Sequence, residues 1–337
     1  MKLLQLVTLG LAATIGLLFA QPGHAQSRSL ATILEAAEAL EPLRTVTVAR
    51  NGEIVAERTY NGADLDAPTN IKSASKSVLS ALIGIAIDRG ILESADQPIA
   101  DFLEPDFPPD PDPRLYEITI GNLLSMQAGL EATSGANYGR WIASGNWVRS
   151  ALGQAFVDTP GGSMIYSTGS SHLLSAILSK ASGSTALDLA RDWLSPLEGF
   201  AITGWHRDPQ GIYLGGNQMA MTPHALLSFG ELYRNHGMTA EGEQILSSAW
   251  IEQSWQPRTQ SRRAGSQYGY GWFLDTFADH EVSYAWGYGG QMLYIVPDLG
   301  LTVVMTSDPS SPSAGNGHRD DLHALLTEIV AETAAHP

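Results

Sequence analysis

The chain has 337 residues, 44% of them hydrophobic, which is enough to bury a large core in one big domain or two. Its formal net charge of −16, from 19 basic and 35 acidic residues, argues against nucleic acids and anionic membrane surfaces as partners. There is no cysteine, which excludes disulfides, thiolate metal sites and cysteine nucleophiles. The nine histidines show no metal-ligand spacing, so we expect no metal site.

The first 25 residues have the pattern of a secretory signal peptide. Lys2 gives a positive start, residues 3–20 form an apolar run, and Gly23-His24-Ala25 is a small-x-small cleavage site. We predict cleavage after Ala25, which makes residues 26–337 a secreted, periplasmic protein. The alternative is a membrane anchor formed by residues 3–20, which are almost enough to span a bilayer.

The mature chain begins with a predicted amphipathic helix over residues 30–43, followed by a β-hairpin. Residues 45–50 alternate as a strand does, and residues 53–60 return as a second strand. Between them, Asn51-Gly52 is a strong signal for a tight turn.

Residues 71–90 are the stretch around which the chain is organised. Apolar residues at positions 78–87 cover almost every face of a helix, which predicts a helix that is buried on all sides and ends at Gly90. Its first turn carries Ser73 and Lys76, whose spacing of three places both side chains on one face.

This spacing suits nucleophilic catalysis. A serine hydroxyl is a weak nucleophile that needs a nearby base, and a lysine can serve when burial or a neighbouring cation lowers its pKa. The positive end of the helix dipole would also favour an alkoxide at Ser73. A Ser-x-x-Lys pair arises by chance as well, but two of the chain's four lysines, Lys72 and Lys76, lie here.

The rest of the chain predicts helices in the middle and strands at the end. Residues 104–113 are acidic and rich in proline, which predicts an extended loop. Predicted helices are residues 118–130 (closed by Gly129), 172–181, 184–193, 223–236 and 319–335. Short β-branched and aromatic segments predict strands over residues 268–274, 283–288, 291–296 and 301–306.

These elements predict an α/β (α+β) fold. The two chain ends, about residues 30–72 and 266–337, are expected to form one antiparallel sheet flanked by helices. The middle of the chain, about residues 77–265, is expected to form a mostly helical subdomain.

Two further segments suit the same chemistry. Tyr166 stands just before a predicted helix, and a tyrosine near a lysine can act as general acid and base in acyl transfer. Residues 285–291 form a glycine-rich strand end, where a backbone N–H can supply half of an oxyanion hole. Taken alone, an ordinary half-buried tyrosine and a bulged hairpin turn account for these segments too.

Together and in this order, the segments resemble the serine β-lactamase and penicillin-binding-protein superfamily, in the branch of the class C β-lactamases, their esterase relatives and the 6-aminohexanoate-dimer hydrolases. The resemblance covers about residues 40–335. It rests on Ser73-Ala74-Ser75-Lys76 as S-x-x-K, Tyr166-Ser167-Thr168 as Y-x-N, and Ala285-Trp286-Gly287 in place of K-T-G or H-T-G. Residues 123–130 and the Y-G-x-G-W match at residues 268–272 support it.

The resemblance implies a serine hydrolase that needs no metal or organic cofactor. Ser73 would attack a carbonyl to form an acyl-enzyme, and Lys76 would help to accept its proton. Tyr166 would relay the proton to the leaving group and later activate the deacylating water. The backbone N–H groups of Ser73 and Tyr288 would form the oxyanion hole. Whether Lys76 or Tyr166 is the main base stays open, since the two would titrate as a coupled pair.

The departures from the family pattern concern the substrate. Ala285 replaces the Lys or His that meets the substrate carboxylate in penicillin-recognising members, and Thr168 replaces the Asn that grips a substrate amide. Trp286, before Gly287, implies a more apolar pocket. We therefore predict a carboxylesterase or amidase that hydrolyses a small-molecule ester or amide. The alternatives are a β-lactamase or D,D-peptidase, and a non-catalytic binding module on the same fold.

Overall fold

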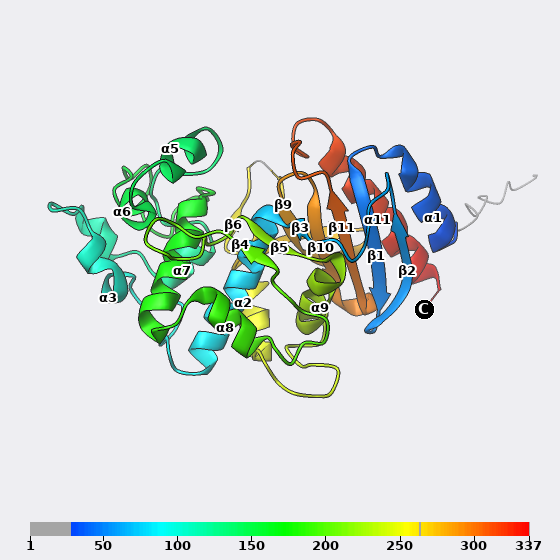
Figure 1. Cartoon of the computed structure of the whole chain (residues 1–337), viewed down its shortest axis with the longest axis horizontal. Coiled ribbons are helices and arrows are strands. Elements are labelled where there is room, and N and C mark those ends of the chain that lie inside the picture. Colours follow the sequence, from blue (N-terminus) through cyan, green and yellow to red (C-terminus); the bar gives the residue numbers. More distant parts are fainter. Residues whose placement is uncertain (1–27, 263, 337) are drawn as a thin grey trace, which may run out of the picture.

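The computed structural model describes residues 28–262 and 264–336. The predicted signal peptide (residues 1–25) and the alternative anchor (residues 3–20) lie outside these ranges. The described chain forms a large sheet with helices on its faces and a mostly helical part beside it (Figure 1). None of the helices in these ranges has both the length and the apolar character needed to cross a bilayer.

The main sheet has eight strands in the order β2-β1-β11-β10-β9-β8-β7-β6, and each adjacent pair is antiparallel. The two ends of the chain contribute neighbouring strands, with Thr47 of β1 opposite Val304 of β11. This confirms the predicted fold. The strands are β1 (Leu43–Arg50), β2 (Glu53–Thr59), β6 (Thr259–Gln260), β7 (Gln267–Tyr268), β8 (Phe273–Phe277), β9 (His280–Gly287), β10 (Gln291–Val296) and β11 (Leu301–Ser307).

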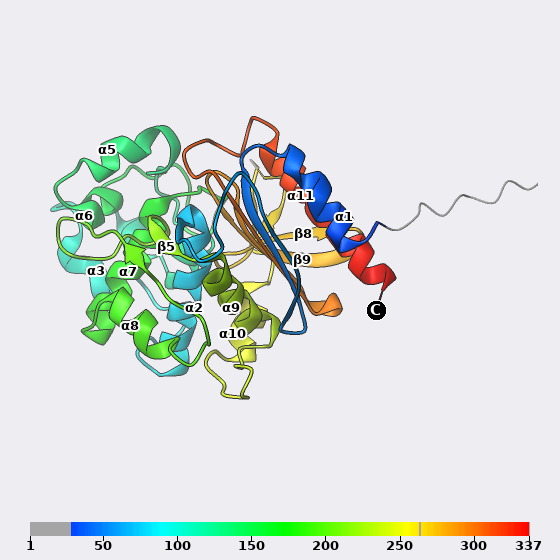
Figure 2. The same ribbon diagram turned by 45° about the vertical axis from the view of Figure 1, so that its right-hand side comes forward.

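Helices cover both faces of this sheet. On the outer face, α1 (Leu30–Ala36) and α11 (His318–Ala335) lie side by side (Figure 2). On the inner face, α9 (Pro223–Arg234) packs on β1, β10 and β11. Because side chains alternate along a strand, Val303 joins the outer core and Val304 the inner one.

The helix at the centre of the molecule is α2 (Ser75–Asp88), which follows a 3₁₀ turn at Lys72–Ala74. Every residue from Ser75 to Ala86 is buried, which confirms a helix enclosed on all sides. The helix ends as predicted, with Gly90 in the left-handed region at φ 68°.

The remaining elements form the helical part and a small second sheet, β3-β5-β4. The helices predicted at 172–181, 184–193 and 223–236 correspond to α7, α8 and α9. The other elements are α3 (Ala100–Leu103), α4 (Ile120–Leu124), α5 (Tyr138–Ile142), α6 (Trp147–Leu152), α7 (Thr168–Ser182), α8 (Ala186–Trp193), α10 (Ser248–Ser254), β3 (Thr69–Asn70), β4 (Gly204–Trp205) and β5 (Met219–Met221).

Four sequence predictions need correction. The helix expected over residues 30–43 is only α1 and a 3₁₀ turn at Ala37–Ala39, because Leu43 already begins β1. The helix expected over residues 118–130 is only α4, because the chain turns at Met126 into the left-handed region with φ 62°. The strand expected over residues 268–274 is split into β7 and β8 at Gly271, which adopts φ 80°. The loop expected over residues 104–113 contains a 3₁₀ turn, and so is not extended throughout.

The predicted subdomain boundary also differs from the structure. The sheet already includes β6 at Thr259–Gln260, before the expected boundary at residue 265. In addition, α9 lies within the expected helical range but packs on the main sheet. The two parts therefore interlock through α2 and α9 instead of dividing at single points of the chain.

The close packing of α2 predicts the effect of a single methyl group. A Cβ added at Gly84 would collide with the ring of Trp250. We expect Gly84→Ala to lower the free energy of unfolding by about 1–3 kcal/mol through overpacking, although alanine favours helix. Urea unfolding measures this. Gly139→Ala, in the open space around α5, is the matched control and should be neutral or stabilising; equal effects of the two substitutions would contradict the packing.

Candidate active site

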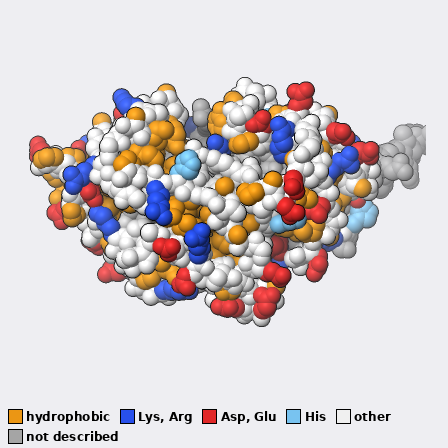
Figure 3. All heavy atoms as spheres, viewed as in Figure 1, with side chains coloured by type: hydrophobic (Ala, Val, Ile, Leu, Met, Phe, Trp, Pro, Cys, Tyr) orange, Lys and Arg blue, Asp and Glu red, His pale blue; other side chains and the backbone are white. Residues whose placement is uncertain are grey.

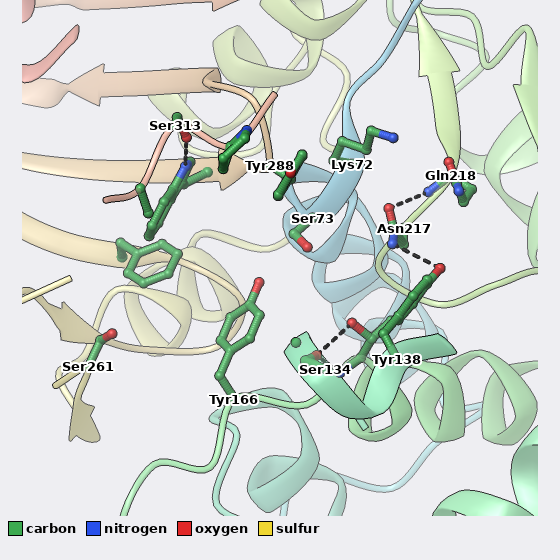
Figure 4. Close-up of a pocket in the computed structure, with 16 residues that line it drawn as sticks. Lys72, Ser73, Ser134, Tyr138, Tyr166, Asn217, Gln218, Ser261, Tyr288 and Ser313 are labelled. Carbon is green, nitrogen blue, oxygen red and sulfur yellow. Dashed lines mark hydrogen bonds between the residues drawn. The ribbon is translucent and has the colours of Figure 1, made fainter. Parts of the chain in front are cut away.

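A cavity of about 730 Å³ lies between the start of α2, the segment before α7 and the end of β9. Five residues that the sequence analysis singled out line it: Ser73, Tyr166, Thr168, Trp286 and Tyr288. Figure 4 shows that Ser73, Tyr166 and Tyr288, which come from segments far apart in the chain, converge on this cavity. The structure thus brings most of the predicted residues together.

Ser73 and Lys76 are in direct contact. Lys76 is only 4% exposed, and its Nζ donates to Ser73 Oγ at 3.1 Å and to the carbonyl oxygen of Gly216 at 2.7 Å. The predicted side-by-side arrangement on the first turn is therefore present. Gly216 was not among the predicted residues.

Burial controls the protonation of Lys76. Desolvation lowers the pKa of Lys76 from 10.5 to about 7, because a buried ammonium loses the hydration that stabilises its charge. Near neutral pH a substantial fraction of Lys76 is therefore an uncharged amine. Such an amine has a lone pair that can accept a proton from the hydroxyl beside it.

Tyr166 lies across the cavity from this pair. Its hydroxyl is directed toward Ser73 (Figure 4), and Lys76 Nζ lies 4.9 Å from the centre of its ring. Burial raises the pKa of Tyr166 to about 12, and a hydrogen bond with Ser73 opposes the rise. The phenol therefore keeps its proton over the physiological range and can donate it.

The end of β9 approaches the start of α2 through a glycine. A Cβ at Gly287 would collide with the carbonyl oxygen of Ile71, so only glycine allows this approach. The next residue, Tyr288, has a 49% exposed side chain, and within the described residues no acceptor takes its backbone N–H. This N–H is therefore free to bind a ligand at the edge of the cavity.

The pleat of β9 separates Ala285 from Trp286. Ala285 is 2% exposed and belongs to the inner core, whereas Trp286 lines the cavity beside Phe273, with ring centres 5.7 Å apart. Trp286 Nε1 donates to Ser313 Oγ at 3.1 Å. One side of the cavity is therefore aromatic.

Thr168 is the first residue of α7, and its side chain is engaged within the protein. Its hydroxyl lies 2.9 Å from Ser134 Oγ, and its backbone N–H donates to the same atom at 2.8 Å. Thr168 and Ser134 are therefore joined to each other in the wall of the cavity.

Sequence reasoning missed the loop that holds Lys76. The backbone N–H of Gly215 donates to His172 Nδ1 at 3.3 Å, so Nε2 carries the ring proton and donates to Asp208 Oδ2 at 3.1 Å. His172 and Asp208 are both buried. This pair anchors the loop whose next carbonyl, that of Gly216, binds Lys76. The successive glycines 215 and 216 were the available sequence signal.

Several solved structures share the fold at low sequence identity. A Bacillus anthracis protein provisionally assigned as a 6-aminohexanoate-dimer hydrolase is 19% identical with a TM-score of 0.71, covering 92% of this chain and 82% of that one. EstCE1, described as a hydrolase with promiscuous acyltransferase activity, is 17% identical with a TM-score of 0.72, covering 90% and 97%. A D-stereospecific amidohydrolase from Streptomyces sp. is 15% identical with a TM-score of 0.70, covering 92% and 100%.

The comparison with curated proteins finds no match. The family model named Beta-lactamase matches residues 36–328, which include the cavity and both faces of the main sheet. This match spans most of the chain. The chain belongs to the Beta-lactamase family of hydrolase folds.

Proposed function

We propose that this protein is a serine hydrolase that cleaves an ester or small amide through an acyl-enzyme on Ser73. The observation that carries the proposal is the contact of 3.1 Å between Ser73 Oγ and the buried Nζ of Lys76. A serine hydroxyl within hydrogen-bond reach of an amine with a pKa of about 7 has the base that nucleophilic attack needs.

In the proposed acylation step, Ser73 Oγ attacks the substrate carbonyl carbon while its proton passes to the neutral amine of Lys76. The backbone N–H groups of Ser73 and Tyr288 stabilise the oxyanion. The proton then returns through Tyr166 to the leaving group, which departs as an alcohol or amine. A water molecule next attacks the acyl-enzyme, and Ser73 recovers its proton when the carboxylic acid leaves.

Lys76 is the main base in this scheme, and Tyr166 is the proton relay. The two pKa values support this division, because Lys76 loses its proton near pH 7 whereas Tyr166 keeps its proton to about pH 12. A base is most effective when its pKa is near the working pH. The descriptions of EstCE1 as a hydrolase with acyltransferase activity and of the Streptomyces protein as an amidohydrolase support hydrolysis by acyl transfer.

Removal of the nucleophile is the first test. Ser73→Ala should lower kcat for a short-chain p-nitrophenyl ester by at least about three orders of magnitude and abolish the mass adduct with a fluorophosphonate. Ser195→Ala, at an exposed serine, is the control and should keep both. A wild type without adduct would instead favour the non-catalytic binding module, and a stable penicillin adduct would favour the β-lactamase or D,D-peptidase.

The pH dependence of kcat/KM tests the identity of the base. We expect kcat/KM to rise about tenfold per pH unit below pH 7 and to level off above it, as Lys76 loses its proton. Tyr166→Phe should lower the plateau by about two to four orders of magnitude and leave the midpoint near 7, because the phenol is not the group that titrates there. If the midpoint near pH 7 in the profile of kcat/KM disappears in Tyr166→Phe, Tyr166 and not Lys76 is the base.

The pKa of Lys76 can also be measured without substrate. Between the folded-state pKa of about 7 and the unfolded value of 10.5, the unfolded chain binds more protons at Lys76, so this group makes stability rise with pH. The unfolding free energy of the wild type minus that of Lys76→Met should rise by about 1.4 kcal/mol per pH unit across this window. Urea unfolding at several pH values measures it, and a flat difference would show an unshifted lysine.

A further inference from the structure

The charge of the cavity differs from that of the protein around it. The chain has a net charge of −16, and acidic side chains are distributed over the face shown in Figure 3. Among the described residues that line the cavity, however, none is acidic and the one charged residue is Lys72. Lys72 has no ion-pair partner in the described part of the chain, so its charge is available to a ligand.

Lys72 is held in an unusual backbone conformation. Its φ of 51° lies in the left-handed region, which is uncommon for a residue with a Cβ. Its backbone N–H donates to Asn70 Oδ1 at 3.0 Å, and its carbonyl oxygen accepts the hydroxyl of Ser75 at 2.7 Å. The start of this side chain is therefore fixed next to the nucleophile Ser73.

The same hydrogen bond determines the orientation of Gln218. Because the backbone N–H of Lys72 can only donate, Asn70 must present Oδ1 to it and Nδ2 to its other neighbour. That neighbour is Gln218, which must therefore accept through Oε1. The Nε2 group of Gln218 is left as a donor on the wall of the cavity.

A second chain of bonds orients Tyr138 in the same way. The backbone N–H of Gln218 donates to Asn217 Oδ1 at 2.9 Å, so Asn217 must use Nδ2 toward Tyr138 Oη, at 3.1 Å. Tyr138 thus accepts this bond, and its own hydroxyl proton stays available. Burial raises the pKa of Tyr138, which keeps that proton in place.

We propose that this wall, formed by Lys72, Gln218 and Tyr138, binds a carboxylate carried by the substrate. It offers an ammonium, an amide N–H and a phenol O–H, which are all donors, and a carboxylate has only acceptors. Figure 4 shows the three residues along one side of Ser73, with Ser313 on the other side. The inference rests on the proposed function and narrows its substrate to a carboxylate-bearing ester or amide.

Burial also favours an anionic partner here. Partial burial removes some of the hydration of the Lys72 ammonium, which lowers the pKa of Lys72. A bound carboxylate compensates for the lost hydration and stabilises the charged form. This cation lies on the wall formed by the start of α2 and the 217–218 loop, whereas Ala285 of β9 points into the core.

Matched esters test the proposal. The p-nitrophenyl monoesters of dicarboxylic acids from glutarate to suberate are each compared with the neutral ester of equal chain length, after subtraction of spontaneous hydrolysis. We expect at least one dicarboxylate ester to exceed its neutral partner about tenfold or more in kcat/KM. Lys72→Met should reduce this ratio of kcat/KM values to about one. Lys180→Met, which removes a lysine paired with Asp106, should leave the ratio unchanged. Added salt should reduce the ratio.

Ratios near one in the wild type, or a ratio that Lys72→Met does not change, would overturn the proposal. A general loss of packing in Lys72→Met lowers both rates and leaves their ratio intact, so the ratio separates the two effects. If no ester is turned over and Ser73 forms no fluorophosphonate adduct, the proposed function fails. The carboxylate site is then tested by measuring adipate binding calorimetrically. Adipate binding that is lost in Lys72→Met and kept in Lys180→Met would support the inference. Absence of adipate binding to the wild type would reject it.

Discussion

The burial of the Lys76 ammonium at the start of an apolar helix is the constraint on which the site depends. An isolated buried charge is costly unless it is paired or neutralised, and the two groups that bind Nζ, Ser73 Oγ and the Gly216 carbonyl, carry no charge. The cost is reduced by loss of the proton, which is why the pKa falls to about 7. The enclosure of α2 thus lowers stability and produces the base.

The loop from Gly215 to Gln218 connects protonation with recognition. Its first N–H is held by the buried His172–Asp208 pair, and its second residue binds Lys76 through a carbonyl. Its last residue, Gln218, accepts a hydrogen bond from Asn70 through Oε1, which leaves its Nε2 as a donor for the cavity. A Cβ at Gly216 would lie 2.5 Å from Lys76 Cγ, so the loop approaches α2 as closely as a backbone can. This short segment therefore both binds the base, Lys76, and forms part of one wall of the cavity.

The sequence was informative where a side-chain type or a strict period carries the signal. The hairpin, most of the C-terminal strands, the apolar helix and the Ser73–Lys76 pair could be predicted for this reason. Tyr166 was selected only by the resemblance to the family. The partner of Lys76 could not, because a carbonyl oxygen has no side-chain signature and Gly216 is 140 residues away in the chain. The end of α4 at Leu124 was equally hidden, since the positive φ of Met126 that follows depends on packing and not on residue type.

The charge of a binding site is a property of all its walls. From the sequence, Ala285 in place of the family's Lys or His favoured an ester or small amide over a β-lactam or D,D-peptidase substrate. In the fold, Ala285 belongs to the core, and Lys72 brings a cation from a different segment. The remaining acidic surface does not cancel this charge, because salt screens exposed charges beyond about 8–10 Å whereas contacts inside a cavity are screened much less. Local geometry, and not net charge, therefore decides which ion the cavity accepts.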